Sequence, residues 1–326
     1  MSRKSYFEKI YTMARTLARL RGGSLWAYFA DAALCSRIYG ASPENYFVLR
    51  FFELPPARRK TYLTSGRSKS ADALLNAGAA SWEKEALAKK DVFNKVFAGL
   101  VKREWLYAPD AGEKELLDFI AARKSLIIKP RSATQGAGVE KLSTADISDP
   151  AGFFRRAVAE KLLLEELITQ HPALDEINPQ CVNSLRINAA RDRAGSTRFI
   201  GGALRCGGVN APADNFHSGG VAYPVDMETG HVSGLGRDNS SLTQYIRHPG
   251  TLRLMPGFEI PFFSEAMEYV RRAMELVPGM GYVGWDIALT PWGPELIEGN
   301  FGYPGGNIIQ LDGVGKYPLL MDCLEE

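Results

Sequence analysis

The chain has 326 residues, of which 45% are hydrophobic and 23% are charged, and its formal net charge is +2. This composition is typical of a globular protein, excludes a disordered or fibrous chain, and gives no overall attraction to nucleic acid. The four cysteines show no C-x-x-C spacing and no apolar run approaches the roughly 20 residues of a membrane span, so we expect a cytoplasmic protein without a zinc site or a disulfide framework.

Residues 1–85 are predicted to form a helical region. An apolar series at helical spacing comes first: Phe7, Ile10, Tyr11, Ala14, Leu17 and Ala18, with Arg21 as its last member. Gly22-Gly23-Ser24 ends this helix, and Ser24 can cap the next one. The first 25 residues are rich in Lys and Arg, with Glu8 as their single acid. Two interpretations of residues 1–21 stay open: the helix packs on the rest of the protein, or its basic surface contacts an anionic membrane.

From about residue 81 the pattern changes to helices that alternate with strands. The predicted helices are 82–101, 113–124, 151–159 and 263–277, and the predicted strands are 105–107, 125–129, 139–142, 161–164, 184–191, 197–204 and 221–226. The strand-rich second half, which ends in a hairpin over 281–300, predicts an α+β fold dominated there by antiparallel sheets.

Lys129 stands at the end of a predicted buried strand and is followed by a loop of small residues. The loop contains Ser132, Thr134, Gly136 and Gly138. Such a loop can fold over phosphates and present backbone N–H groups to them, while the lysine neutralises charge. It lacks the spacing of a P-loop, and a glycine-rich hairpin with a solvated lysine is the alternative.

Two further strands carry polar groups. The strand at 161–164 leads into Glu165-Glu166, whose backbone at a pocket edge suits an adenine, although the segment by itself favours an ordinary core strand. Arg186 lies inside the strand 184–191, where its planar fork suits a phosphate or a carboxylate, or a structural ion pair. Downstream, the stretch NFHSGGVA offers possible ligand contacts or merely structural groups: Asn215, His217, Gly219 and Gly220.

The hairpin at 281–300 places carboxylates inside apolar strands. If Leu289 pairs with Glu295, Asp286 faces Glu298, and Asn300 lies on the same face of its strand. Like charges that face each other need a positive group between them, and an all-oxygen cluster suits Mg²⁺. The alternative is a hairpin whose carboxylates simply reach solvent.

Taken in this order, these segments resemble the ATP-grasp superfamily from about residue 86 to residue 310. The strings EELITQHPALDEINPQCVNSLRI and DNFHSGGVAYPVDMETG are similar to the sugar-transfer-associated ATP-grasp group, within its glutamate-ligase-like branch. The resemblance implies an ATP-grasp fold whose two α+β subdomains, about 86–170 and 171–326, clamp ATP. The helical region 1–85 stands in place of the usual N-terminal α/β domain.

The resemblance also implies roles for individual residues. Lys129 and Lys90, the latter in the segment KKDVFNKVF, contact ATP phosphates, and Arg186 holds the γ-phosphate and the acyl phosphate formed from it. Glu165, Glu166 and Ile168 form an adenine hinge. Mg²⁺ is bound by Asp286, Glu298 and Asn300. The remaining nucleotide contacts are Ser132, Gly136, Gly138 and His171, and the substrate contacts are Asn183, Asn215, His217, Gly219 and Gly220.

The activity that the resemblance implies is a carboxylate–amine ligase that uses ATP and Mg²⁺, forms an acyl phosphate, and releases ADP and phosphate. The group is linked to cell-surface polysaccharide or small-metabolite biosynthesis. The expected partners are therefore a small-molecule carboxylate and an amine, and no nucleic acid. Two alternatives stay open: a kinase on the same fold that phosphorylates a hydroxyl, and a nucleotide-binding protein without catalysis.

Overall fold

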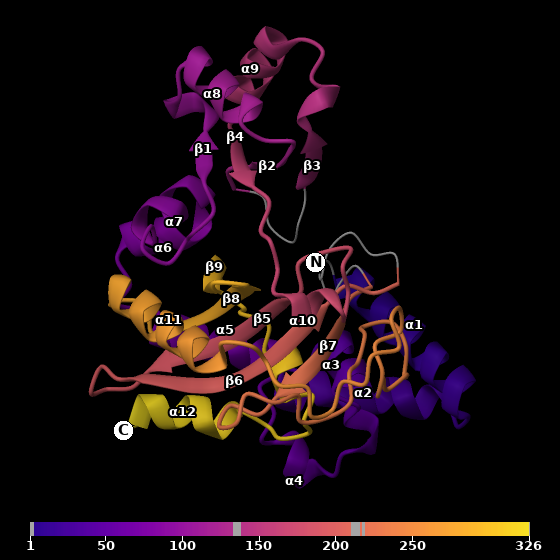
Figure 1. The fold of residues 1–326 in the computed structure, drawn as a ribbon. Helices are drawn as coiled ribbons and strands as arrows, with labels where there is room; N and C mark the ends of the chain where they lie inside the picture. The colour runs from indigo at the N-terminus through magenta and orange to yellow at the C-terminus, as the bar shows by residue number, and fades with distance from the viewer. Residues whose placement is uncertain (1–2, 133–137, 210–215, 217–218, 326) are drawn as a thin grey trace.

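The computed structural model describes residues 3–132, 138–209, 216 and 219–325. The helices are α1 (Arg3–Arg21), α2 (Leu25–Tyr39), α3 (Pro43–Val48), α4 (Pro56–Arg59), α5 (Ser65–Leu75), α6 (Ser81–Ala88), α7 (Lys90–Val96), α8 (Glu113–Ala121), α9 (Pro150–Ala159), α10 (Pro172–Asp175), α11 (Phe263–Leu276) and α12 (Tyr317–Glu325). The strands are β1 (Trp105–Tyr107), β2 (Ser125–Pro130), β3 (Glu140–Ser143), β4 (Leu162–Glu166), β5 (Ser184–Arg191), β6 (Thr197–Cys206), β7 (Val221–Val225), β8 (Tyr282–Thr290) and β9 (Gly293–Asn300). Figure 1 shows their arrangement.

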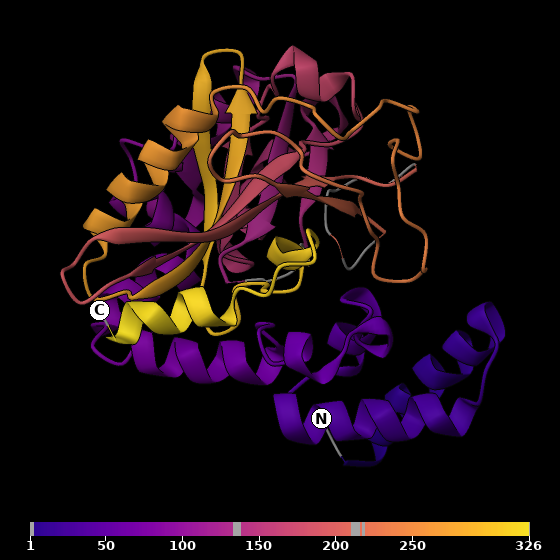
Figure 2. The ribbon, with the colours of Figure 1, turned by 90° about the horizontal axis from the view of Figure 1, so that it is seen from below.

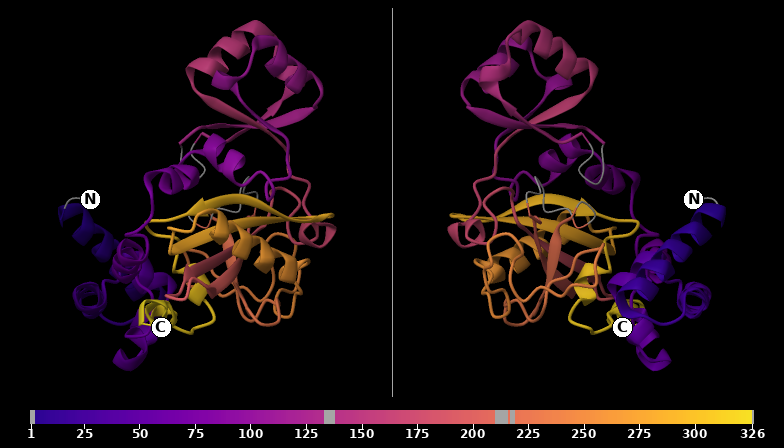
Figure 3. Two further views of the ribbon diagram at one scale, coloured as in Figure 1. Left: turned by 90° about the vertical axis from the view of Figure 1, so that its left-hand side faces the viewer. Right: turned by 90° about the vertical axis from the view of Figure 1, so that its right-hand side faces the viewer.

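The strands form two antiparallel sheets, as the α+β prediction requires. The smaller sheet has the order β1-β4-β2-β3, and α8 and α9 cover it with a core of their own. The larger sheet has the order β7-β6-β5-β8-β9. The smaller sheet and its helices stand above the larger sheet in Figures 1 and 3, joined to it through the segments next to α7 and after β4. Each sheet therefore belongs to a separate subdomain.

The larger sheet is covered on both faces. The face that carries Trp285 and Ile287 packs against α11 and α7. The opposite face packs at one end against the N-terminal helices, in a cluster that includes Leu17 of α1 and Tyr282 of β8. Figure 2 shows α5 running alongside α12 beneath this sheet. Residues 1–85 therefore share a hydrophobic core with the second subdomain.

The predicted helix at 82–101 is two helices. Lys89 has an extended backbone (φ −117°, ψ 119°) and ends α6, and the next residue begins α7. The Lys90 N–H donates to Arg131 O at the end of β2, 3.1 Å away. This tertiary hydrogen bond holds the start of α7 against the smaller sheet, which is why helical propensity alone did not reveal the break.

In the described ranges, no helix combines the length and the apolar character that a membrane span requires. The helix α2 is capped at both ends. The Ser24 hydroxyl accepts from Ala27 N at the start of α2, and Gly40 closes α2 in the left-handed conformation (φ 65°). The predicted boundary at Gly22-Gly23-Ser24 is confirmed.

Candidate nucleotide and metal site

The hairpin of β8 and β9 brings Asp286 opposite Glu298, as predicted, but by a different register. Leu289 pairs with Pro294 rather than with Glu295. A β-bulge next to Asp286 then leaves Ile297 as an additional residue in β9, which moves Glu298 opposite Asp286 and Asn300 opposite Gly284. The predicted facing pair is confirmed, whereas the pairing proposed to explain it is wrong by one residue.

Asp286 is buried, and two arginines balance its charge. Arg186 on the neighbouring strand β5 donates from Nε and, over 2.8 Å, from Nη2 to the two carboxylate oxygens. Arg205 on β6 donates from Nη1 to Oδ2 over 2.7 Å. Burial opposes ionisation, but the two guanidinium groups hold the pKa of Asp286 well below its usual range. Arg186 thus forms a structural ion pair with Asp286, which is one of the interpretations that the sequence left open for it.

Glu298 lies at the solvent-exposed end of the same cluster. Asn300 Nδ2 donates to Glu298 Oε1 over 3.1 Å. Surrounding protein atoms remove part of the hydration of Glu298, the Asp286 carboxylate adds repulsion, and both effects raise the pKa of Glu298. A cation beside Glu298 would relieve this repulsion.

The donor set fits Mg²⁺ held partly by protein and partly by ligand oxygens. Among the described residues, no group of three or more His, Cys, Asp or Glu side chains forms a metal site. The cluster offers two carboxylates and the amide of Asn300. Mg²⁺ typically uses one or two carboxylates and completes its shell with waters and substrate phosphates. The cluster therefore suits a metal–nucleotide complex better than a closed structural site.

Lys129, near the end of β2, belongs to a buried charge network. Its Nζ lies 2.6 Å from Glu165 Oε2. Arg103 Nε donates to the same oxygen over 2.8 Å, and Asn94 Nδ2 donates to Glu165 Oε1 over 2.9 Å. Burial opposes ionisation of Glu165, but Lys129 and Arg103 hold its pKa well below the usual range. The Glu165 side chain thus orients Lys129 and stays ionised.

Lys90 connects this network to the hairpin. It begins α7 and is half-buried. Burial and the charge of Lys129 lower the pKa of Lys90, whereas Glu298 and Glu165 raise it. Glu298 also interacts electrostatically with Lys129. Electrostatic interactions therefore couple Lys90, Lys129 and Glu298, which lie on α7, β2 and β9.

The expected adenine hinge lies partly inside the smaller sheet. Glu165 is on the inner strand β4, where it pairs with Trp105 of β1 and Ile127 of β2. The Glu166 N–H donates to Glu104 O over 2.9 Å. The chain leaves the strand after Glu166, and Ile168 is half-buried in the segment that follows. The backbone of Glu165 and Glu166 is therefore paired within the smaller sheet, and an adenine contact at Ile168 stays a prediction.

His171 and Asn183 anchor the segment that follows β4. The His171 N–H donates to Leu289 O over 2.7 Å, and His171 Nδ1 accepts from Ala173 N at the start of α10. Asn183 is fully buried, and its amide donates to Gln170 Oε1 and to two backbone carbonyls of the same segment. These hydrogen bonds give Asn183 a structural role, and its contact with a substrate stays a prediction.

The two predicted loops are described only in part. Gly136, Asn215 and His217 lie outside the described residues. Ser132 is exposed just after β2, and Gly219 and the buried Gly220 precede β7. Gly138 has a φ of 70°, and a Cβ there would lie 2.8 Å from Pro130 Cγ, so only glycine fits without strain.

Sequence reasoning missed Arg205 and Arg103. Arg205 had a usable signal, because it stands two residues after Ala203, the β6 partner of Arg186, and therefore shares its face. Arg103 had none. It lies in a loop, and its carboxylate partners Glu165 and Glu295 are distant in the sequence.

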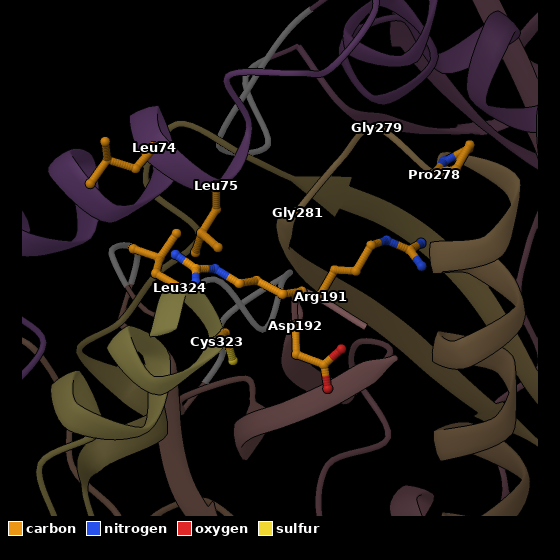
Figure 4. A pocket seen from close by; sticks show the side chains of 10 residues that line it. Leu74, Leu75, Arg191, Asp192, Pro278, Gly279, Gly281, Cys323 and Leu324 are labelled. Atoms are coloured by element: carbon orange, nitrogen blue, oxygen red, sulfur yellow. The ribbon is translucent and has the colours of Figure 1, made fainter. Parts of the chain in front are cut away.

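A cavity of about 290 Å³ lies elsewhere, between the end of α5, the β5–β6 turn, the end of α11 and α12. Figure 4 shows Leu75, Arg191 and Cys323 around it. The Arg191 guanidinium is held by the carbonyls of Gly195 and Met274. No predicted site residue lines this cavity.

Three solved structures illustrate what the fold is similar to. The ATP-grasp ligase PsnB complexed with a minimal precursor matches with 18% identity over 79% of this chain and 70% of its own, at a TM-score of 0.47. PsnB complexed with minimal precursor, Mg and ADP matches with 17% identity over 76% of this chain and 61% of its own, at a TM-score of 0.44. The ADP complex of purK, an N5-carboxyaminoimidazole ribonucleotide synthetase, matches with 14% identity over 74% of this chain and 52% of its own, at a TM-score of 0.45. This chain thus spans about half to two thirds of the length of these proteins.

These structural similarities are loose, and no curated protein matches the sequence. The sequence model of one family, described as sugar-transfer-associated ATP-grasp, matches residues 152–321, which is more than half of the chain. The matched region contains β4 to β9, including Arg186 and the β8–β9 hairpin. The protein belongs to the sugar-transfer-associated ATP-grasp family and has the ATP-grasp fold.

Proposed function

We propose that the protein is an ATP-dependent ligase that joins a carboxylate to an amine through an acyl phosphate, with Mg²⁺ as its cofactor. The observation that carries the proposal is the Arg103 bridge, which ties Glu165, 2.6 Å from Lys129, to Glu295 on the strand β9 that also carries Glu298. Cations on one side and carboxylates on the other are the groups that a metal–triphosphate complex needs. Membership of the ATP-grasp family supports the same conclusion.

The first step transfers the γ-phosphoryl group. A carboxylate oxygen of the acid substrate attacks the γ-phosphorus, the bond to the β-phosphate oxygen breaks, and ADP leaves. Lys129 and Lys90 would neutralise the phosphates, and Glu298 and Asn300, with Asp286, would hold the metal. The bound Mg²⁺ supplies charge neutralisation at the phosphate oxygens.

The second step forms the amide. The amine attacks the acyl carbon, inorganic phosphate leaves with the electron pair of the C–O bond, and the amine loses a proton. Arg186 stabilises the negative charge in both steps. Among the described residues, Asp286 and Pro304 O occupy three of its five N–H groups, so two remain for an oxyanion.

Hydroxylamine trapping tests this proposal. The protein is incubated with Mg-ATP, hydroxylamine and a panel of amino acids, dicarboxylates and uronic acids. We expect one class of acid to give ADP, phosphate and a hydroxamate, and the Glu298→Gln variant to give none. A stable phosphate ester on a hydroxyl compound, without a hydroxamate, would assign a kinase instead. Absence of Mg-dependent ATP or ADP binding would contradict both activities.

The family description also leads us to propose a cellular context. Its association with sugar transfer favours a role in the biosynthesis of cell-surface polysaccharides or related metabolites. Uronic acids and amino sugars would then be the acid and amine to test first. Turnover restricted to substrates without a sugar would contradict this context and leave the ligase reaction intact.

A further inference from the structure

The outer side of the α1–α2 hairpin exposes large apolar side chains. The inner side of α1, with Ile10 and Leu17, is buried in the core that covers the larger sheet. The predicted apolar series on α1 is therefore divided, because Phe7 and Tyr11 point away from this core and are exposed. We define the hairpin face by six residues of α1 and α2: Phe7, Tyr11, Trp26, Phe29, Leu34 and Ile38.

Aromatic rings form a connected cluster within the hairpin face. Phe7 stacks on Phe29 with ring centroids 6.3 Å apart, Trp26 meets Phe29 edge-on at 5.9 Å, and Tyr11 lies 6.3 Å from Trp26. Trp26 is nevertheless 67% exposed. A contiguous apolar patch of this kind on a soluble protein marks an interaction surface.

The charges beside the hairpin face are mainly positive. Arg15 and Arg19 follow Tyr11 at intervals of four residues, which places them beside it on α1, and Arg37 lies between Leu34 and Ile38 on α2. All three arginines are exposed, and none has an ion-pair partner among the described residues. Asp31, the only acid on α2, is engaged by Arg59.

We propose that the hairpin face docks on an anionic membrane surface. Tryptophan and tyrosine prefer the headgroup region, where an apolar ring and a polar edge are both satisfied. Leu34 and Ile38 would enter the outer acyl region, while Arg15, Arg19 and Arg37 would contact anionic headgroups. Figure 3 shows the hairpin at one side of the molecule, away from the smaller sheet and its helices.

The same charges argue against self-association through this face. A symmetric dimer places the same patch of both copies together, so the arginines of one copy would approach those of the other. Such like charges repel each other at an apolar interface, whereas an anionic membrane attracts them. Charge complementarity therefore favours the membrane.

Vesicle flotation with the full-length protein tests the proposal. Vesicles of phosphatidylcholine alone are compared with vesicles that contain about 30% phosphatidylserine. We expect the protein to float with the anionic vesicles at low salt, and the bound fraction to fall as salt screens the charges. The double variant Arg15→Glu/Arg19→Glu should reduce partitioning about tenfold or more, and Trp26→Ala should also weaken it.

Matched variants separate docking from unfolding. Lys102→Glu/Lys124→Glu changes two exposed cations on other elements, and Trp292→Ala removes another exposed tryptophan. Both should float like the wild type, and all variants should retain the wild-type melting temperature. Equal flotation of Arg15→Glu/Arg19→Glu and the wild type would overturn the proposal, as would a failure of the wild type to bind. A wild-type dimer that Trp26→Ala converts to a monomer would also overturn it.

Discussion

Asp286 lies between two arginines and a second carboxylate, and this position gives it two tasks. It fixes the plane of the Arg186 guanidinium through two hydrogen bonds, and it contributes an oxygen to the cluster with Glu298. The two tasks are compatible because a carboxylate has about four lone-pair directions. In the proposed reaction, the site would therefore depend on ion pairs as much as on metal ligands.

At the scale of single residues, Glu298→Gln tests whether Glu298 is a metal ligand. We expect Mg-dependent turnover to fall about 100-fold or more, because the amide removes the exposed charge that attracts the metal. Thermal stability should stay equal or rise slightly, since repulsion from Asp286 disappears. Metal titrations of turnover and thermal melts check this, with the exposed Glu275→Gln as a control. Unchanged Mg-dependent turnover would rule out Glu298 as a ligand.

Arg186→Lys tests the role of the arginine without leaving Asp286 unpaired. Arg205 still contacts Asp286, so the fold should survive. Lysine keeps the charge but loses the planar fork, so kcat should drop about 100-fold while nucleotide affinity stays within a few fold. Single-turnover kinetics and calorimetric titration with ADP measure the two effects. A loss confined to nucleotide affinity would contradict a role in the transition state.

At the scale of elements, Arg103 joins the two sheets. It donates to Glu165 of β4, to Glu295 of β9 over 2.7 Å, and to Leu296 O. All three charged groups are buried. Since Glu165 also contacts Lys129, the bridge sets where that lysine lies relative to the hairpin.

Arg103→Met should destabilise the protein by about 3–5 kcal/mol at pH 7, because two buried carboxylates lose a partner. In the wild type the depressed pKa of Glu165 gives stability that is present above the ordinary glutamate value, about 4.3, and is lost as the pH falls through the folded-state value. The loss of stability at acid pH should be smaller in Arg103→Met than in the wild type. Urea unfolding at pH 7 and pH 3 measures both effects. Lys114→Met, at an exposed ion pair, should change little.

The same elements show what the sequence could and could not predict. Local periodicity and turn residues located most strands and the N-cap of α2. The predicted register put Glu298 opposite Asp286 only because the β-bulge offsets its error of one residue. The break at Lys89 was not predictable locally, because a hydrogen bond to Arg131 on another element causes it. Arg103 was missed for the same reason. Partners set by tertiary folding leave no periodic signal.

At the scale of the whole molecule, residues 1–85 are part of the folded body rather than an appendage. Leu17 is fully buried against the core shared with the larger sheet, whereas Leu20 on the same helix is 51% exposed. Leu17→Ala should therefore cost about 2–5 kcal/mol in a single cooperative transition. Leu20→Ala should stay within about 0.5 kcal/mol of the wild type. Two separate transitions in Leu17→Ala would show that α1 unfolds independently.

The bulge in β9 has a consequence for alignments of related chains. Side chains alternate between the two faces of a strand, and the additional residue Ile297 reverses that alternation. Without the bulge, Glu298 would point with Trp285 into the apolar core. A comparison that treats β9 as one uninterrupted strand would therefore assign Ile297 to the site and Glu298 to the core. An alignment of this strand is best fixed at Gly299, where a Cβ would lie 2.8 Å from the Trp285 ring.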